Sequence, residues 1–521
     1  MAPCPKPSRN VSSVGSTPDP NRTSSSYTFF PSSAEIGRSS TPDDLMSGKN
    51  IDGHLDSRPA GGTVVVPNRL RPTFLTSIRI NWSPVKNGPR NPIAATVLGM
   101  RVLFASYGEK TQFFSMVQLA CAFFAAGHEV RVASEPAMAD VITSAGLTAV
   151  PVGTNSELYR ILYTFEGREN VRNSRTAPPF HLVGEPVEKI SAAELQEGYY
   201  ETVRWWWRLV NDPMIEDLVE FCRFWRPDLV IWEPVTYAAP VAATLVGAAH
   251  ARMLWGLDVF AHLRGHYLRL RAGQQPDGTE DVLAGWLDMV AAKYGGGFRE
   301  EMTSGQFTID QLPPSVRLDT DVTYVPMRYV PYNGRSVVPR WLWEPPERPR
   351  LAFTLGTSAV ERTGGYVVRV GDLLGALADL DAQIVATLPA QERDKLGPLP
   401  PNVRVEEYVP LRALASTCAG VISHGGWGTV LTSAMAGLPQ LTLTHQFDEP
   451  LLGRKLAEQG GALTMGATDV TPDGLREMAQ RLLTDASLKA GAASFRDQLT
   501  AMPTPAALVP ELERLTAVHR S

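Results

Sequence analysis

From about residue 100 onward, short apolar runs alternate with longer amphipathic stretches. Five runs in the first half have the length and continuous hydrophobicity of buried parallel strands. They are 101–106, 129–133, 147–152, 227–232 and 251–255. The stretch 116–126 is apolar at helical spacing and stops at Gly127, and 137–145 stops at Gly146. This alternation of strands and helices predicts βαβ units around a parallel sheet.

The alternation is interrupted once and then begins again. A proline-rich, irregular stretch covers roughly 313–349, after which the apolar runs 351–356, 383–387 and 420–422 restore the pattern. Two doubly wound α/β domains joined by a linker are the simplest architecture for this order. Because ligands of such sheets bind beyond the carboxyl ends of the strands, we expect the site in a cleft between the two domains.

Residues 1–99 have a different character. The first 50 residues contain 12 Ser, 7 Pro and 4 Thr and show no apolar periodicity. Such a segment buries too little apolar surface to offset the entropy lost on ordering, so we predict that 1–99 is a disordered extension. A dispensable tail, or an upstream start codon assigned in error, is the simpler interpretation, and a functional extension is the other.

Composition and charge exclude several classes of function. The 521 residues carry 54 acidic and 49 basic side chains, a net charge of −5, which disfavours partners such as nucleic acid or an anionic membrane surface. No run approaches the ~18 apolar residues of a membrane span, and the amino terminus lacks the apolar core of a secretion signal. The four cysteines are scattered, so neither a disulfide framework nor a zinc site is expected. We therefore expect a cytoplasmic protein with reduced thiols and no bound metal.

The strongest chemical motif is Ser423-His424-Gly425-Gly426-Trp427-Gly428-Thr429, which follows an apolar run and precedes a helical pattern. Glycines let the backbone approach a ligand closely, and the amino end of the following helix offers free N–H groups and a positive dipole. With His424 and Thr429 as side-chain donors, the loop favours a diphosphate ligand over a tight turn that holds a structural histidine.

Two further segments lie at strand ends in the same half of the chain. Gly356-Thr357-Ser358 is either a second phosphate-binding element or an ordinary turn. Asp448 and Glu449 either accept hydrogen bonds from sugar hydroxyls or cap the helix that follows them. The residues alone leave both choices open.

Together these motifs resemble the glycosyltransferases of the GT-B fold that use nucleotide-sugar donors. More narrowly, residues 100 to about 518 resemble the erythromycin-type deoxysugar transferases of actinobacterial antibiotic pathways. The stretches that carry this likeness are 125–134, 226–234, 327–334 and Cys418-Ala419 leading into the His-Gly-Gly loop. The resemblance implies two Rossmann-like domains that face a central cleft. It assigns 100–335 to the acceptor, 336–505 to the nucleotide sugar, and 506–521 to a helix that returns to the first domain.

The resemblance also implies an activity. Such enzymes transfer a deoxysugar from a TDP-sugar to a polyketide- or macrolide-type aglycone, with inversion and without a metal or another cofactor. Close members of the family typically need an activator protein, a haem-less homologue of cytochrome oxygenases that docks on the amino-terminal domain. The implied partners are therefore a TDP-deoxysugar and a hydrophobic aglycone, with the activator protein as a hypothesis.

By the same resemblance, the second domain holds the donor through its glycine-containing loops, a segment beside the base and an acidic pair. The residues are Gly356, Thr357, Ser358, His424, Gly425, Gly426, Gly428 and Thr429 for the diphosphate, Val409 and Pro410 for the base, and Asp448 and Glu449 for the sugar. Many relatives carry Gln where this chain has Glu449. Fixed N–H donors and a histidine suit a leaving diphosphate because they stabilise its growing negative charge without a metal.

One position departs from the family pattern. Such transferases usually place a histidine just after the first strand as the general base, and alignment of 101–106 puts Gln112 at that position. A glutamine does not accept a proton at neutral pH, and loss of a general base typically costs about 10²–10⁴-fold in rate. Either Glu233 or Glu109 takes this role, or the acceptor needs little help, or the chain is not a working transferase.

Other classes of function stay open. A catalytically impaired sugar-nucleotide-binding helper of a paralogous transferase is supported by Gln112 alone. A nucleotide-sugar epimerase on the same fold would need acid and base groups in the second domain, where only Asp448 and Glu449 offer themselves. A Rossmann oxidoreductase is disfavoured because no Gly-x-Gly-x-x-Gly follows the first strand of either domain.

Three consecutive tryptophans, Trp205-Trp206-Trp207, interrupt a helical pattern in the first domain. Consecutive helical residues point in different directions, so at most one or two of them can line a single pocket. A wall for an apolar acceptor, a surface for a partner protein and plain core packing are the interpretations that stay open.

Overall fold

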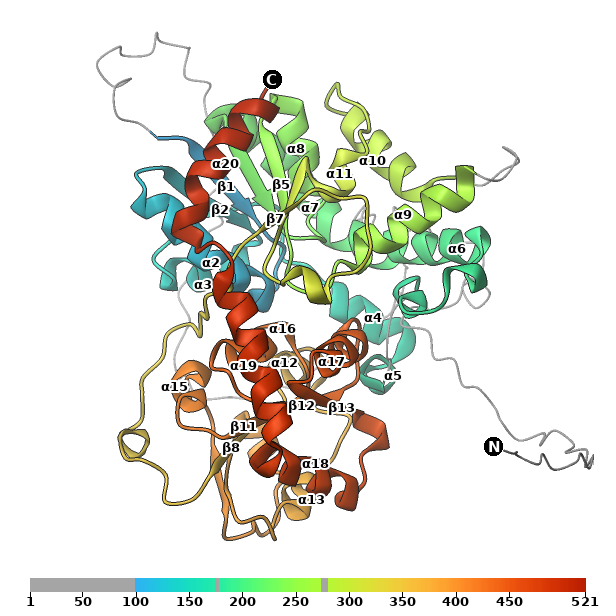
Figure 1. Ribbon diagram of the computed structural model, residues 1–521. Coiled ribbons are helices and arrows are strands. Elements are labelled where there is room, and N and C mark those ends of the chain that lie inside the picture. The colour runs from blue at the N-terminus through green and yellow to red at the C-terminus, as the bar shows by residue number, and fades with distance from the viewer. Residues whose placement is uncertain (1–98, 174–177, 273–279) are drawn as a thin grey trace, which may run out of the picture.

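The computed structural model describes residues 99–173, 178–272 and 280–521, which form two parallel sheets flanked by helices (Figure 1). The prediction of disorder for 1–99 lies outside the described residues apart from Gly99. The first sheet has the order β3-β2-β1-β4-β5-β6-β7. Its strands are β1 (Arg101–Ala105), β2 (Glu129–Ser134), β3 (Ala149–Pro151), β4 (Leu229–Trp232), β5 (Ala249–Met253), β6 (Phe307–Asp310) and β7 (Tyr324–Pro326).

The second sheet has the order β10-β9-β8-β11-β12-β13, and all its neighbouring strands are parallel. Its strands are β8 (Arg350–Thr354), β9 (Gln383–Thr387), β10 (Val403–Glu406), β11 (Gly420–Ser423), β12 (Gln440–Thr444) and β13 (Ala462–Gly466). The strand order reverses at β1 and β4 in one sheet and at β8 and β11 in the other, as in doubly wound folds. The predicted α/β class with two Rossmann-like domains is confirmed.

Helices connect the strands in both domains. The α-helices of the first domain are α2 (Lys110–Ala125), α3 (Ala139–Ser144), α4 (Leu158–Glu166), α5 (Arg168–Asn173), α6 (Ala192–Thr202), α7 (Arg208–Trp225), α8 (Ala238–Val246), α9 (Val259–Ala272), α10 (Val282–Ala292) and α11 (Glu301–Ser304). Those of the second half are α12 (Ser358–Thr363), α13 (Val370–Ala376), α14 (Ala390–Arg393), α15 (Leu411–Ala415), α16 (Trp427–Met435), α17 (Glu449–Glu458), α18 (Pro472–Thr484), α19 (Ala486–Ala501) and α20 (Pro505–His519).

Some element bounds differ from those expected. The helix predicted over 116–126 begins six residues earlier, because the Glu109 carboxylate accepts a hydrogen bond from the Thr111 amide and caps α2. The helix predicted over 137–145 begins with a 3₁₀ turn at Pro136–Met138. The stretch 313–349 is largely irregular, but it also contains the short edge strand β7.

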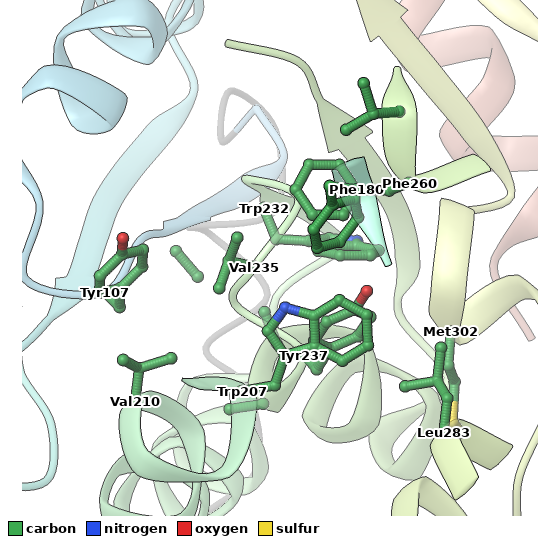
Figure 2. Packing of buried hydrophobic residues seen from close by; sticks show 14 of the residues in the cluster. Tyr107, Phe180, Trp207, Val210, Trp232, Val235, Tyr237, Phe260, Leu283 and Met302 are labelled. Carbon is green, nitrogen blue, oxygen red and sulfur yellow. The ribbon is translucent and has the colours of Figure 1, made fainter. Parts of the chain in front are cut away.

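Large aromatic side chains fill the core on one face of the first sheet (Figure 2). The Trp207 ring lies 4.9 Å from the Tyr237 ring, and the Trp232 ring lies 5.9 Å from Tyr237. Trp205 and Trp207 are almost fully buried, whereas Trp206 is half-buried. The three tryptophans lie in a π-helical turn, Val203–Trp207, which directs their side chains differently.

The last helix lies against the first domain, although the chain reaches it from the second (Figure 1). Leu508, Val509 and Leu512 of α20 pack in the hydrophobic cluster that contains Phe113 and Phe123 of α2. Beyond the helix, the Ser521 amide donates to the Gly247 carbonyl at 3.1 Å. The chain thus links the two domains at two places, 327–349 and 501–505.

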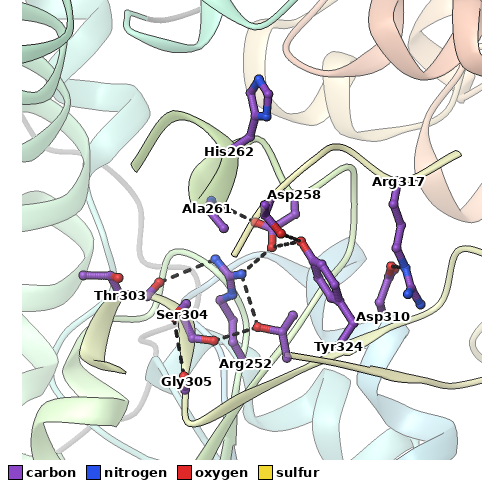
Figure 3. Close-up of polar contacts among 12 residues, drawn as sticks. Arg252, Asp258, Ala261, His262, Thr303, Ser304, Gly305, Asp310, Arg317 and Tyr324 are labelled. Atoms are coloured by element: carbon purple, nitrogen blue, oxygen red, sulfur yellow. Dashed lines mark hydrogen bonds and ion pairs between the residues drawn. The ribbon is translucent and has the colours of Figure 1, made fainter. Parts of the chain in front are cut away.

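A buried ion pair supports the loop that follows β5. The Arg252 guanidinium pairs with Asp258, and both side chains are almost fully buried (Figure 3). Asp258 also accepts from the Tyr324 hydroxyl at 2.8 Å and from the Ala261 amide at 3.0 Å. These bonds fix the segment 254–258, which faces the second domain.

Candidate active site

A cavity of about 420 Å³ lies between the two domains, beyond the carboxyl ends of the strands β1, β8 and β11. Ten of the twelve predicted donor residues line it: Gly356, Thr357, Ser358, Val409, His424, Gly426, Gly428, Thr429, Asp448 and Glu449. Pro410, the N-cap of the short helix α15, and Gly425, which faces Thr442 and Thr444 of β12, are not in the lining.

The two glycine-containing loops meet because their strands are neighbours. Strands β8 and β11 pair in parallel, so 356–358 and 424–429 emerge at the same edge of the sheet. A Cβ added at Gly356 would lie 2.8 Å from His424 Cε1, and one added at Gly426 would lie 2.2 Å from His424 Nε2. Gly356 and Gly425 also have φ values of 71° and 91°, which side-chain-bearing residues rarely adopt. The loops therefore need glycine to accommodate the imidazole.

His424 is a neutral donor or acceptor in this site. Burial lowers the pKa of His424 to about 4, and the nearby Arg362 charge acts in the same direction. A backbone hydrogen bond at Thr354 acts in the opposite direction and raises the pKa of His424, but by less than burial lowers it. An uncharged imidazole at neutral pH provides a hydrogen bond at the cavity without adding a fixed charge.

The acidic pair at the start of α17 is held by backbone amides. Glu449 Oε2 accepts from the amides of His445 and Gln446 at 3.1 and 3.0 Å. Asp448 Oδ2 accepts from the Leu257 amide of the first domain at 2.8 Å. Burial raises the pKa of each carboxyl group to about 7, so both are partly protonated near neutral pH. Asp448 thus ties the two domains together as well as lining the cavity.

Phe447, next to this pair, lies among aromatic rings of the first domain. Its ring centroid is 5.2 Å from Phe180, 6.0 Å from Trp206, 5.8 Å from Trp255 and 5.9 Å from Phe260. Its φ of 51° is in the left-handed region, which is strained for a phenylalanine. The aromatic contacts offset this strain and connect the donor loop to the opposite wall.

The three candidate catalytic residues lie in different environments. Gln112 lines the cavity and is almost fully buried, and its Oε1 has no hydrogen-bond partner among the described residues. Glu109 lies behind the lining and forms an ion pair with Arg362 of α12 in the second domain. Glu233 is fully buried behind the wall and does not line the cavity.

Glu233 has a structural network of its own. It accepts hydrogen bonds from the Trp255 indole at 2.8 Å, from the Val235 amide at 3.1 Å and from the Thr236 hydroxyl. Burial raises the pKa of Glu233 to about 7, against the lowering effect of these donors. In this arrangement Glu233 orients Trp255, which is itself in the cavity lining.

The wall opposite the glycine loops consists mainly of aromatic and aliphatic side chains from the first domain and from the start of the link that follows it. They are Tyr107, Phe114, Leu158, Tyr159, Val171, Trp206, Trp255, Tyr329 and Tyr332. Sequence reasoning singled out only Trp206 among these, as one of three tryptophans. A search for aromatic residues at the carboxyl ends of predicted strands would have added Tyr107 and Trp255.

Several expectations concern what the protein lacks. In the described parts of the chain, no helix is both long and apolar enough to cross a membrane. Within the same residues, His, Cys, Asp and Glu side chains form no group suited to hold a metal ion. Cys121, Cys222 and Cys418 are free thiols, and burial raises the pKa of Cys222 to about 12.

Comparison with known proteins agrees with this geometry. Residues 121–356 match the family described as "Erythromycin biosynthesis protein CIII-like, N-terminal domain", and residues 371–515 match its C-terminal domain. The 10-deoxymethynolide desosaminyltransferase of Streptomyces venezuelae is 45% identical over 81% of this chain and 98% of its own length. The tylactone mycaminosyltransferase of Streptomyces fradiae is 42% identical over 84% of this chain and 96% of its own length.

Solved structures show the same relationship. The glycosyltransferase VinC, in a crystal structure with dTDP, matches with a TM-score of 0.72 and 36% identity over 80% of this chain and all of its own length. The spinosyn forosaminyltransferase SpnP matches with a TM-score of 0.67 and 37% identity over 80% of this chain and 99% of its own. The chain is a glycosyltransferase of GT-B fold and belongs to the erythromycin biosynthesis protein CIII-like family.

Proposed function

We propose that this glycosyltransferase transfers a deoxysugar from a TDP-sugar to a macrolide- or other polyketide-type aglycone, with inversion and without a metal. The observation that carries the proposal is the two-sided cavity. Glycine loops and a neutral histidine form one wall, and aromatic side chains form the other. The first wall suits a nucleotide diphosphate and the second suits a hydrophobic acceptor.

The diphosphate lies, in this proposal, against the loop 424–429 at the amino end of α16. The backbone N–H groups there, with His424 and Thr429, stabilise the negative charge that grows on the leaving group. Val409 lies beside the base, and Asp448 and Glu449 accept hydrogen bonds from the sugar. Because burial raises their pKa values to about 7, these two carboxyl groups are partly neutral near pH 7. They therefore bind the sugar hydroxyls with less negative charge than two fully ionised carboxylates would carry.

The placement of the two walls supports inversion. The acceptor oxygen approaches the anomeric carbon from the first domain, and the diphosphate leaves toward the second. A single displacement across the cavity inverts the configuration of the anomeric carbon. In this proposal 100–335 binds the acceptor, 336–505 binds the nucleotide sugar, and 506–521 fastens the second domain to the first.

The test is transfer by the purified full-length chain. TDP-desosamine and TDP-mycaminose are the first donors, since two relatives are named for those sugars, and macrolactones are the first acceptors. We expect a product heavier by one sugar, equimolar TDP release, an inverted anomeric centre by NMR, and full activity in EDTA. Tight TDP binding with no glycoside from any donor–acceptor pair would contradict the proposal and favour a helper role.

The same assay tests the activator hypothesis. The reaction is run with the chain alone and with an added haem-less cytochrome-like activator protein. We expect the second protein to raise turnover. Equal turnover without it would remove this partner from the proposed function.

A further inference from the structure

The acceptor wall lacks an obvious proton acceptor. Among the described residues that line the cavity, the carboxylates are Glu407, Asp448 and Glu449, and all three belong to the second domain. Gln112 occupies the position expected for the base, and an amide does not take a proton. The glycosyl transfer proposed above still has to remove one proton from the acceptor hydroxyl.

A hydroxyl at the start of α2 connects the cavity to a carboxylate behind it. Thr111 is exposed and lines the cavity. Its Oγ1 donates to Glu109 Oε1 at 2.9 Å, and its amide contacts the same oxygen at 3.3 Å. The threonine proton therefore points toward Glu109, so the oxygen lone pairs are available to a group in the cavity.

The other carboxylate oxygen is held from the opposite domain. Arg362 Nε donates to Glu109 Oε2 at 2.9 Å, and Nη2 of the same guanidinium contacts that oxygen. Arg362 also lines the cavity, where it is the sole lysine or arginine among the described lining residues. Its charge acts on His424 and Glu449, which places it between the donor loops and Glu109. A bound diphosphate would compete with Glu109 for this guanidinium.

We propose that Thr111 and Glu109 form a proton relay that replaces the missing histidine, and that Arg362 couples this relay to the donor. The acceptor oxygen bonds to the anomeric carbon as the bond from that carbon to the diphosphate oxygen breaks, and TDP leaves with the electron pair. The acceptor proton moves to Thr111 Oγ1, and the threonine proton moves to Glu109 Oε1. As Arg362 turns toward the diphosphate, its ion pair with Glu109 breaks, and the Glu109 carboxylate keeps its contact with Thr111.

The inference rests on the proposed transfer activity, and one set of variants tests it. Thr111→Val removes the hydroxyl but keeps the shape of the side chain, Thr111→Ser restores the hydroxyl, and Glu109→Gln removes the final acceptor. We expect kcat to fall about 10²–10⁴-fold in the Val and Gln variants and less than tenfold in the Ser variant. The dissociation constant for TDP, measured by calorimetry, stays within threefold of wild type in Thr111→Val.

Two further variants separate the relay from general domain closure. Lys110 forms a neighbouring ion pair with Glu361 across the same domain boundary, so Lys110→Ala is the matched control and stays within about twofold of wild type. Arg362→Gln weakens TDP binding at least tenfold and lowers kcat. The relay is contradicted if Thr111→Val keeps wild-type kcat, or if Thr111→Ser is as slow as Thr111→Val. A wild-type protein that transfers no sugar at all would instead overturn the proposed function, and the relay with it.

Discussion

The two walls of the cavity are built on different principles. The donor wall is centred on two loops, 356–358 and 424–429, each contiguous in sequence and each placed at the end of a strand. The acceptor wall consists of side chains such as Tyr159, Trp206 and Trp255, which come from three separate parts of the first domain. Nucleotide binding here depends on local motifs, whereas the shape offered to the acceptor depends on the packing of the whole domain.

The largest expected effect is a break in the donor wall alone. In Gly426→Ala, the new Cβ would lie 2.2 Å from His424 Nε2, so the imidazole must leave its position or the loop must shift. We expect the dissociation constant for TDP to rise at least 100-fold, since the loop and the histidine are both displaced, while the melting temperature changes little.

Gly371→Ala in α13 is the matched control for this change. A Cβ at Gly371 meets no atom within 4 Å. TDP affinity should equal that of wild type in this variant, as measured by calorimetry. Equal TDP affinity in the Gly426 and Gly371 variants would show that the loop does not hold the nucleotide.

The next largest effect is expected at Phe447, which contacts both walls. Phe447 belongs to the donor loop but packs among Phe180, Trp206, Trp255 and Phe260, so Phe447→Leu should disturb both sites. We expect about a tenfold rise in both the dissociation constant for TDP and the acceptor KM. The lost ring packing, about 1 kcal/mol or more, would weaken the binding of both ligands.

Phe124→Leu, at a ring that is 68% exposed, is the control for this substitution. It should leave both constants unchanged. A change in only one of them in Phe447→Leu would mean that the walls are independent.

A more limited effect, on one ligand only, isolates the acceptor wall. Trp206→Leu removes ring surface from the cavity, and we expect about a tenfold rise in acceptor KM, which corresponds to about 1.4 kcal/mol of lost contact. TDP binding should stay within twofold of wild type. Steady-state kinetics with a saturating donor measures the first value, and Trp343→Leu, at a residue 71% exposed, serves as the control.

The same contrast explains what could be predicted from the sequence. Two parallel sheets and the loops 356–358 and 424–429 follow from local patterns, because strand, glycine turn and helix lie next to each other in the chain. The contact of Asp448 with the Leu257 amide joins positions 191 residues apart, and no local pattern indicates it. The early start of α2 also involves a contact between distant positions. Glu109, which caps the helix, forms an ion pair with Arg362 across the domain boundary.

The smallest expected effect on catalysis comes from Glu233, behind the acceptor wall. Its pKa is raised by burial to about 7 from an ordinary value of 4.5, so the folded protein holds this proton more tightly than the unfolded chain. The resulting stability is fully present below pH 4.5 and is lost as the pH rises toward 7, a loss of about 3 kcal/mol for this residue. Glu233→Gln cannot ionise, so the free energy of unfolding should fall less between pH 5 and pH 8 than in wild type.

Urea titrations at those two pH values measure this slope. Asp448 and Glu449 have pKa values raised in the same direction, so some of the slope remains in the variant. Glu477→Gln, at an exposed position of α18, should keep the wild-type slope.

Since the amide of Glu233→Gln still accepts a hydrogen bond from the Trp255 indole, kcat should stay within about threefold of wild type. If Glu233→Gln instead slows turnover by two orders of magnitude or more and leaves the slope unchanged, then Glu233 is the proton acceptor in place of Glu109.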